Sequence, residues 1–214
     1  MAINPNADFN ELTTWLNQNL LSTNSFVPHI DAIPNVKSKG IYFWFMRPDG
    51  YKALSNYVTI NPIEPKYYRD IEGVKYDLAY IGTSGTGKQG KSTICNRLKW
   101  HINQTHGNGE IGHGTLSTFR AGLGALLADD LIIPNTEKEV NAFMKEFMIV
   151  FWIEYPDDKS LIDNDEDKLI NTIKPLINLK SNPNAKSTSS VNSTKLYKSR
   201  RKLVYDNSKL RLGL

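Results

Sequence analysis

Apolar residues recur at helical spacing in several stretches of the chain. Between residues 8 and 22 they are Phe9, Leu12, Trp15, Leu16 and Leu20, which predicts an amphipathic helix. Similar spacing predicts helices over residues 92–106, 116–127 and 164–174, and a shorter one that ends near residue 145. Helices are therefore expected in several separate parts of the chain.

Three other stretches are rich in β-branched and aromatic residues and predict strands. Residues 40–46 read GIYFWFM, residues 77–83 read DLAYIGT, and residues 147–153 read FMIVFWI. The last is so uniformly apolar that we expect both of its faces to be buried. Residues 51–60 predict a further strand after a Pro-Asp-Gly turn. The expected fold class is α+β, with a small central three-stranded sheet, mixed or antiparallel, flanked by helices.

A change in composition divides the chain into three parts. We expect an N-terminal helical extension over residues 1–35, a catalytic domain over 36–184, and a basic C-terminal tail over 185–214. Residues 186–214 hold eight Lys or Arg and one acid, which gives this segment a net charge of +7. The whole chain has a net charge of +4, so the residues before 186 have a net charge of −3. Such a tail is either a solvated segment or a contact for a polyanion.

Composition also excludes several classes of protein. With 214 residues and 40% hydrophobic content, the chain has the composition of an ordinary globular domain. Cys95 is the single cysteine, which excludes an internal disulfide and a cysteine-cluster zinc site. No apolar run approaches the ~20 residues needed to span a bilayer. Since the first residues do not resemble a secretory signal, we expect a cytoplasmic protein that does not bind a membrane.

Residues 85–92 read GTGKQGKS and match the phosphate-binding pattern G-x-x-x-x-G-K-[ST]. In a nucleotide-binding enzyme, backbone N–H groups at the start of the next helix would surround phosphates, with Lys91 and Ser92 on the outer phosphates and magnesium. That class of protein needs parallel strands joined by crossover helices. The residues before 76 do not alternate in that way, so this interpretation stays an alternative.

A second pattern is spread over the whole chain. Gly40-Ile41-Tyr42 lies on one expected strand and Tyr80-Ile81-Gly82 on the next, and Arg97 and His101 lie one turn apart on the helix that follows. Glu166 and Asn178 come later, at the two ends of the expected helix 164–174 and its proline stop. In order and spacing these residues resemble the GIY-YIG nuclease family, and the resemblance covers about residues 39–184.

The resemblance implies a chemistry that suits these residue types. Tyr42 would be the general base or orient the attacking water, Tyr80 would hold the water or phosphate, and Arg97 would grip the phosphate with its forked N–H groups. His101 would contact the nucleophile or phosphate. Glu166 would bind a single Mg²⁺ or Mn²⁺, kept ionised by the N-terminus of its helix. Asn178 would fasten the site by hydrogen bonds to the backbone or to a tyrosine.

Taken singly, each of these residues has a plainer interpretation. Tyrosines on strands are more often core-edge aromatics, and a lone Arg or Glu is more often a solvated surface charge. A zinc site of His101, His106 and His113 is a further alternative, although their spacing does not favour it. Only the combined order and spacing of the pattern favours a nuclease.

Arg97 follows Tyr80 at a longer interval than in the shortest family members, because the glycine- and lysine-rich loop intervenes. Loops of this length occur in the restriction-enzyme branch, which the stretch 117–127 also resembles. We therefore expect a restriction-type endonuclease that acts on DNA, double-stranded by preference, and forms a homodimer to cut both strands. The expected nucleic-acid contacts are Lys88, Lys91, Lys99, Arg120, Arg200 and Arg201. A non-catalytic nucleic-acid-binding module on the same fold is the other alternative.

Overall fold

A computed structural model describes residues 2–26, 33–54, 66–86, 90–102, 117–127, 135–178, 199–204 and 206–207. Its five strands form one sheet in the order β1-β5-β2-β4-β3, and every pair of neighbours is antiparallel. The strands are β1 (Ser25–Phe26), β2 (Lys39–Met46), β3 (Tyr68–Ile71), β4 (Val74–Ser84) and β5 (Met148–Tyr155). The expected α+β fold with a small central sheet is confirmed, with β1 and β3 added at the edges of the three expected strands.

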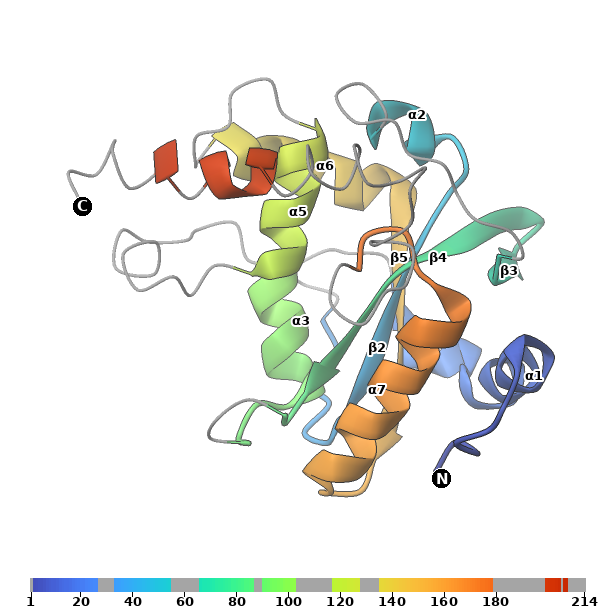
Figure 1. Cartoon of the computed structure of the whole chain (residues 1–214). Coiled ribbons are helices and arrows are strands. Elements are labelled where there is room, and N and C mark those ends of the chain that lie inside the picture. The colour runs from blue at the N-terminus through green and yellow to red at the C-terminus, as the bar shows by residue number, and fades with distance from the viewer. Residues whose placement is uncertain are drawn as a thin grey trace.

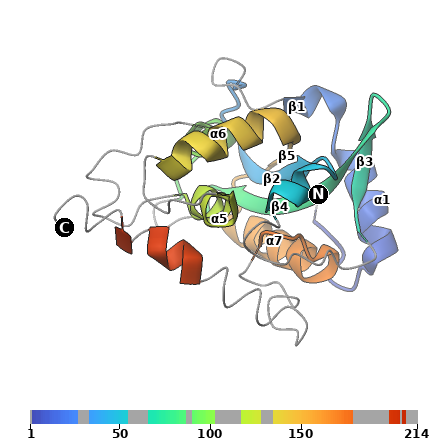
Figure 2. The ribbon, with the colours of Figure 1, turned by 90° about the horizontal axis from the view of Figure 1, so that it is seen from above.

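Helices cover both faces of this sheet (Figures 1 and 2). One face carries α3 (Ile94–Ile102), α5 (Thr118–Leu127) and α6 (Asn135–Phe147), which share a core with Trp44 and Met46 of β2. The other face carries α1 (Phe9–Asn19) and α7 (Lys159–Ile173), which share a core with Phe43 and Phe45. The central strand β2 is thus buried on both sides, and alternate residues of one aromatic run serve two separate cores.

The N-terminal residues belong to this architecture. Asp8 accepts a hydrogen bond from the Glu11 N–H while the Glu11 carboxylate accepts one from the Asp8 N–H, a reciprocal capping box that starts α1. Leu12, Leu16 and Leu20 are fully buried against the sheet. Residues 25–26 then pair with β5 as strand β1. The proposed division of the chain at residues 35 and 184 stays a prediction, but α1 and β1 share the core and the sheet of the residues that follow.

Three element predictions were wrong in whole or in part. Residues 50–54 form the short helix α2 (Gly50–Leu54) where a strand was expected, and residues 55–60 lie outside the described residues. Helix α6 has 13 residues and is longer than the short helix expected to end near residue 145. Helix α7 begins at Lys159, capped by the Asp158 side chain, and not at residue 164. In each case the buried side chains of the helix, such as Leu54 or Ile162, decide where the helix lies.

Candidate active site

The two tripeptides that carry glycine, isoleucine and tyrosine lie side by side on β2 and β4. Tyr42 is the cross-strand partner of Gly82. A Cβ atom on Gly82 would lie 2.4 Å from the Tyr42 hydroxyl oxygen and 2.5 Å from its Cζ, so the Tyr42 ring occupies the space that a side chain would need. Gly40 is restricted in a similar way, since its Cβ would lie 2.0 Å from the Ile153 carbonyl oxygen. Both glycines are therefore required by close packing.

Helix α3 brings His101 and Arg97 to the Tyr42 hydroxyl. The His101 Nε2 atom lies 2.7 Å from the Tyr42 oxygen, and both side chains are buried. The Arg97 guanidinium lies close enough to Tyr42 to lower the pKa of its hydroxyl. Arg97 and His101 are four residues apart, so one face of α3 presents both to the same atom. The structure therefore brings together three of the predicted catalytic residues from two elements.

Burial chiefly raises the pKa of the Tyr42 hydroxyl well above its usual value, and the neighbouring Tyr80 and Glu166 raise it further, whereas Arg97 lowers it. Tyr42 is therefore a neutral phenol in the free protein at neutral pH. The pKa of the Arg97 guanidinium is also raised, first by Tyr42 and also by Tyr80 and Glu166. These couplings place Glu166 in the same electrostatic cluster as Tyr42, Tyr80 and Arg97.

Glu166 does not occupy the helix N-terminus that was predicted for it. Because α7 begins at Lys159, Glu166 lies near the middle of the helix, and the macrodipole at the N-terminus does not reach it. Its half-buried side chain instead has the positive charge of Arg97 nearby. The carboxylate therefore has an ionic neighbour that the sequence interpretation did not assign to it.

Asn178 joins the segment after α7 to the part of the β4 edge that does not pair with β3. Its side-chain amide donates to the Ile81 carbonyl and its side-chain oxygen accepts from the Ile81 N–H, both at 2.8 Å. The Ile177 N–H donates to the Ala79 carbonyl in the same way. These bonds satisfy buried backbone groups of β4 beyond the end of β3. The side chain of Tyr80 packs beside this edge against Phe119, with ring centroids 4.7 Å apart.

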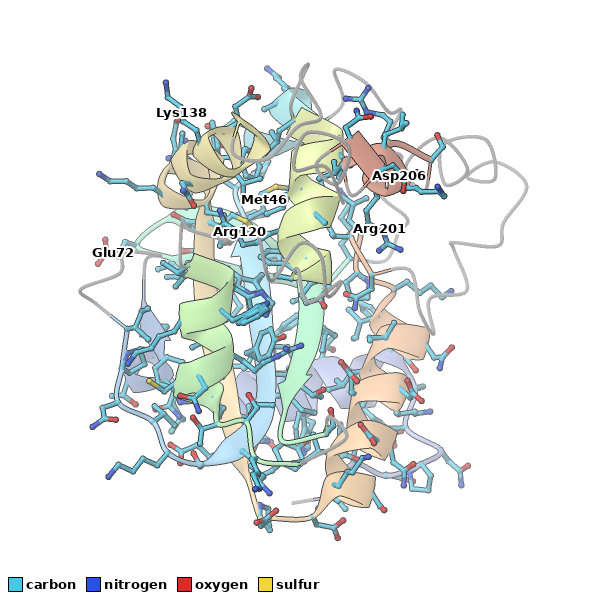
Figure 3. All side chains as sticks on the ribbon, turned by 90° about the vertical axis from the view of Figure 1, so that its left-hand side faces the viewer. Met46, Glu72, Arg120, Lys138, Arg201 and Asp206 are labelled. Carbon is cyan, nitrogen blue, oxygen red and sulfur yellow. The ribbon has the colours of Figure 1, made fainter. Side chains whose placement is uncertain are left out.

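On the far side of His101 lies Arg120, for which the prediction of a nucleic-acid contact was wrong. Its side chain is fully buried, as Figure 3 shows between the helices, whereas Glu72 and Lys138 lie at the periphery. One terminal nitrogen donates to the His101 carbonyl and the other to the Asn141 side-chain oxygen, both at 2.6 Å. Arg120 therefore supports α3 from inside and has no surface to offer to DNA.

The other basic residues lie on or near the surface in varied settings. Lys91 and Lys99 are exposed, Arg201 is half-buried, and Lys88 lies outside the described residues. The Arg200 Nε atom donates to the Ala125 carbonyl at the end of α5, at 2.6 Å. Arg200 thus already has a role within the protein, and a contact between these residues and nucleic acid stays a prediction.

The phosphate-loop interpretation does not fit this architecture. Strand β4 is antiparallel to both of its neighbours, whereas that class of protein needs parallel strands. The first N–H groups of α3 are also taken, since Ile94 donates to the Ser38 carbonyl and Cys95 to the Val36 carbonyl. A phosphate would have to displace these bonds. The match over residues 85–92 is therefore incidental, although residues 87–89 lie outside the described residues.

A histidine zinc site also finds no support in the described part of the chain. Both ring nitrogens of His101 are engaged, one with Tyr42 and the other with Ser117, and His106 and His113 lie outside that part. Among the described residues there is no group of three or more His, Cys, Asp or Glu side chains placed to hold a metal ion.

None of the helices that the structure describes is long and apolar enough to cross a bilayer.

Sequence reasoning missed Ser117, whose hydroxyl lies 2.7 Å from the His101 Nδ1 atom. The residue is 16 positions from His101 and precedes a different helix, so helical spacing could not connect the two. A serine directly before an apolar helical pattern is an N-cap signal, and that signal would have singled out Ser117 as the start of α5. Its contact with the site is decided by how α5 packs on α3 and β2.

Comparisons with known proteins were made for the whole chain. A family model described as the GIY-YIG catalytic domain matches residues 40–202, which is most of the chain and includes both tripeptides, Arg97, His101, Glu166 and Asn178. Neither the curated proteins nor the solved structures contain a match to this chain.

Proposed function

Since the chain belongs to the GIY-YIG nuclease superfamily, we propose that it is a divalent-metal-dependent endonuclease that hydrolyses phosphodiester bonds of DNA. The observation that carries the proposal is the convergence on one buried hydroxyl. The Tyr42 hydroxyl on β2 is hydrogen-bonded to His101 on α3, and its pKa is influenced by Arg97 on α3, Tyr80 on β4 and Glu166 on α7. A core-edge tyrosine with a plain structural role has no need of that many polar and charged neighbours.

Each side chain has a role in the proposed hydrolysis. A water attacks phosphorus in line, and the bond from phosphorus to the leaving oxygen breaks. Tyr42 first loses its own proton to solvent, as Arg97 and His101 stabilise the phenolate, and the phenolate then orients that water and takes one proton from it. The leaving oxygen takes a proton from solvent. Arg97 also holds a phosphate oxygen with its forked N–H groups. Tyr80 helps to position the water or phosphate, and Asn178 keeps β4 in place through its two bonds to Ile81.

The residues present fit a hard divalent cation at Glu166. Magnesium keeps several of its water ligands and is commonly bound through one or two carboxylates together with substrate phosphate oxygens. A single half-buried carboxylate next to the proposed phosphate position meets that requirement. A bound Mg²⁺ or Mn²⁺ would neutralise negative charge on Glu166 and on the phosphate. Because Glu166 contributes to the raised pKa of Tyr42, that neutralisation would also make the Tyr42 phenolate easier to form.

The finer expectations belong to the same proposal. Double-stranded DNA is the proposed substrate, with Lys88, Lys91, Lys99, Arg200 and Arg201 as the proposed contacts with its backbone. A restriction-type enzyme with one such site per chain would cut both strands as a homodimer. A cytoplasmic location suits such an enzyme.

Plasmid cleavage tests this proposal. We expect magnesium-dependent nicking by the wild type and losses of at least about 10²-fold for Tyr42→Phe, Arg97→Ala and Glu166→Ala. Glu139→Ala is the matched control, because Glu139 is an exposed carboxylate on α6. Equal nicking by all variants would refute the assignment. DNA binding by the wild type with no cleavage under any divalent metal would instead identify a non-catalytic nucleic-acid-binding module.

A further inference from the structure

His101 is contacted on several sides by the beginning of α5 and the residue before it. The Ser117 hydroxyl oxygen lies 2.7 Å from the His101 Nδ1 atom. The Phe119 ring meets the His101 ring edge to face, with centroids 5.3 Å apart. One terminal nitrogen of the Arg120 guanidinium donates to the His101 carbonyl oxygen at 2.6 Å. Two of these contacts involve the imidazole ring, and the contact with Arg120 holds the main chain of α3.

The bond from Arg120 caps the C-terminal end of α3. The helix ends at Ile102, so the His101 carbonyl is among the last four carbonyls, which have no partner within a helix. A positive charge at a helix C-terminus is also favoured by the macrodipole. The fully buried Arg120 side chain brings both a donor and a positive charge to this end from the neighbouring helix. A neutral apolar side chain of similar volume would supply neither.

The second arm of the Arg120 guanidinium reaches α6. Its other terminal nitrogen donates to the Asn141 side-chain oxygen at 2.6 Å. Because the guanidinium is planar and its donors have a fixed geometry, the two arms cannot move independently. Apolar contacts of Leu98 and Ile102 also hold α3 in the core, but such contacts are not directional. The fork of Arg120 therefore fixes the end of α3 relative to α6 more strictly than apolar packing does.

We propose that Arg120 is a positioning residue for the reaction, whose forked link between α6 and α3 holds His101 at the Tyr42 hydroxyl. The His101 Nε2 atom lies 2.7 Å from that oxygen. A displacement of about 1 Å in a catalytic group costs on the order of 10²-fold in rate. The consequence for cleavage rests on the proposed nuclease function, whereas the effect of Arg120 on the position of the His101 ring does not.

The plainer interpretation is that Arg120 only stabilises the fold. Arg120→Lys and Asn141→Ala separate the two roles. Lysine is shorter and has one nitrogen in place of the planar fork, so it cannot hold both acceptors in the same geometry. Asn141→Ala leaves Arg120 in place and removes its acceptor on α6. Leu126→Ala is the matched control, because Leu126 is buried in the same core, six positions after Arg120 on α5, and its truncation leaves a cavity.

The position of His101 can be measured in the whole chain without DNA. Its ring lies among those of Tyr42, Trp44 and Phe119, with centroids 5.1, 6.3 and 5.3 Å away. The ring currents of these aromatic neighbours make the chemical shifts of the carbon-bound protons of His101 sensitive to small displacements. Histidine ¹H–¹³C NMR spectra therefore report the position of the ring, and the signals lost in His101→Gln identify it.

We expect the His101 ring signals to shift in Arg120→Lys and in Asn141→Ala, and to stay at their wild-type positions in Leu126→Ala. Unchanged signals in the two test variants, or an equal shift in the control, would overturn the inference. If Arg120→Lys does not fold, Asn141→Ala decides the test by itself, because it removes only a half-buried polar side chain.

Cleavage kinetics complete the test. Arg120→Lys and Asn141→Ala should each lower kcat on the order of 10-fold at saturating DNA, with little change in KM, and Leu126→Ala should keep the wild-type kcat. Since both substitutions break one fork, the double variant should cleave within about twofold of Arg120→Lys. Wild-type kcat in Arg120→Lys, or losses that multiply in the double variant, would refute the role. Absence of any cleavage by the wild type would refute the proposed nuclease function and leave the NMR result standing.

Discussion

Gly82→Ala tests whether the position of the Tyr42 ring requires that residue 82 on the neighbouring strand has no side chain. A Cβ at residue 82 would lie 2.4 Å from the Tyr42 oxygen, whereas ordinary contacts begin at 3.4 Å, so the ring must move by about 1 Å. The ring is fully buried and its hydroxyl is hydrogen-bonded to His101, which leaves little freedom for that movement.

Two effects of different size follow for Gly82→Ala. Overpacking of this kind costs about 1–3 kcal/mol of unfolding free energy, which a folded domain of ordinary stability tolerates. A displacement of about 1 Å in a catalytic group costs on the order of 10²-fold in rate. We therefore expect a folded protein with a urea midpoint modestly below that of the wild type and plasmid nicking reduced about 10²-fold.

Gly73→Ala is the matched control, because both glycines are close in sequence and only one faces the site. Gly73 lies in the turn between β3 and β4 with φ +78°, and a Cβ there meets nothing within 4 Å. Alanine in that conformation costs about 1 kcal/mol or more by backbone strain alone. The control should lose stability and keep its cleavage rate. Wild-type cleavage by folded Gly82→Ala, or equal losses of rate in both variants, would refute the steric account.

Two further predictions concern stability. Asn178→Ala should lower the unfolding free energy by about 2–4 kcal/mol, since it leaves the buried N–H and C=O of Ile81 without partners; a urea midpoint equal to that of the wild type would contradict this. Burial raises the pKa of Tyr67 to about 12, with Arg69 opposing. The unfolded chain therefore loses the Tyr67 proton near pH 10, whereas the folded protein keeps it until about pH 12. The contribution of Tyr67 to the unfolding free energy is complete below pH 10 and is lost as the pH rises to about 12. The loss amounts to about 1.4 kcal/mol per pH unit. Tyr67→Phe should flatten this slope of unfolding free energy against pH in urea titrations, and an unchanged slope would show that other tyrosines cause it.

Much of the fold could be predicted from local pattern. The aromatic run of β2 and the apolar run of β5 predicted two central strands, because segments buried on both faces have few polar positions. The spacing of leucines predicted α1, and the buried stripe of Ile94 and Leu98 predicted α3. These elements are recognisable because the same residues serve local periodicity and tertiary burial.

Local pattern failed where two signals of similar strength competed. Both Asp158 and Asn164 are good N-cap residues, and the burial of Ile162 on the sheet decides in favour of Asp158. Residues 51–54 are a short apolar stretch of the kind that suits helix or strand, and the burial of Leu54 in the core beneath α5 accompanies the helix. Length and periodicity alone cannot separate such alternatives.

A register shift in the sheet was beyond any sequence argument. Trp44 pairs with Tyr80 and Phe45 pairs with Leu78, so β4 has one extra residue, Ala79, between these pairs. Simple alternation would place Leu78 and Tyr80 on the same face. The irregularity instead puts Leu78 in the core under α7 and Tyr80 in the core under α3 and α5. Tyr80 shares the face of Tyr42 through the regular pairs Tyr42–Gly82 and Trp44–Tyr80, so it is Leu78 that the irregularity turns to the opposite core.

The sequence by itself determined which chemical groups are present and roughly where the chain forms strands and helices, because order, spacing and hydrophobic period are local properties. Only the tertiary structure decided that Gly82 makes room for the Tyr42 ring, that Arg120 is internal, and that Ser117 reaches His101. These relations join residues far apart in the chain through packing of side chains at close range. A one-dimensional pattern carries no information about such distances.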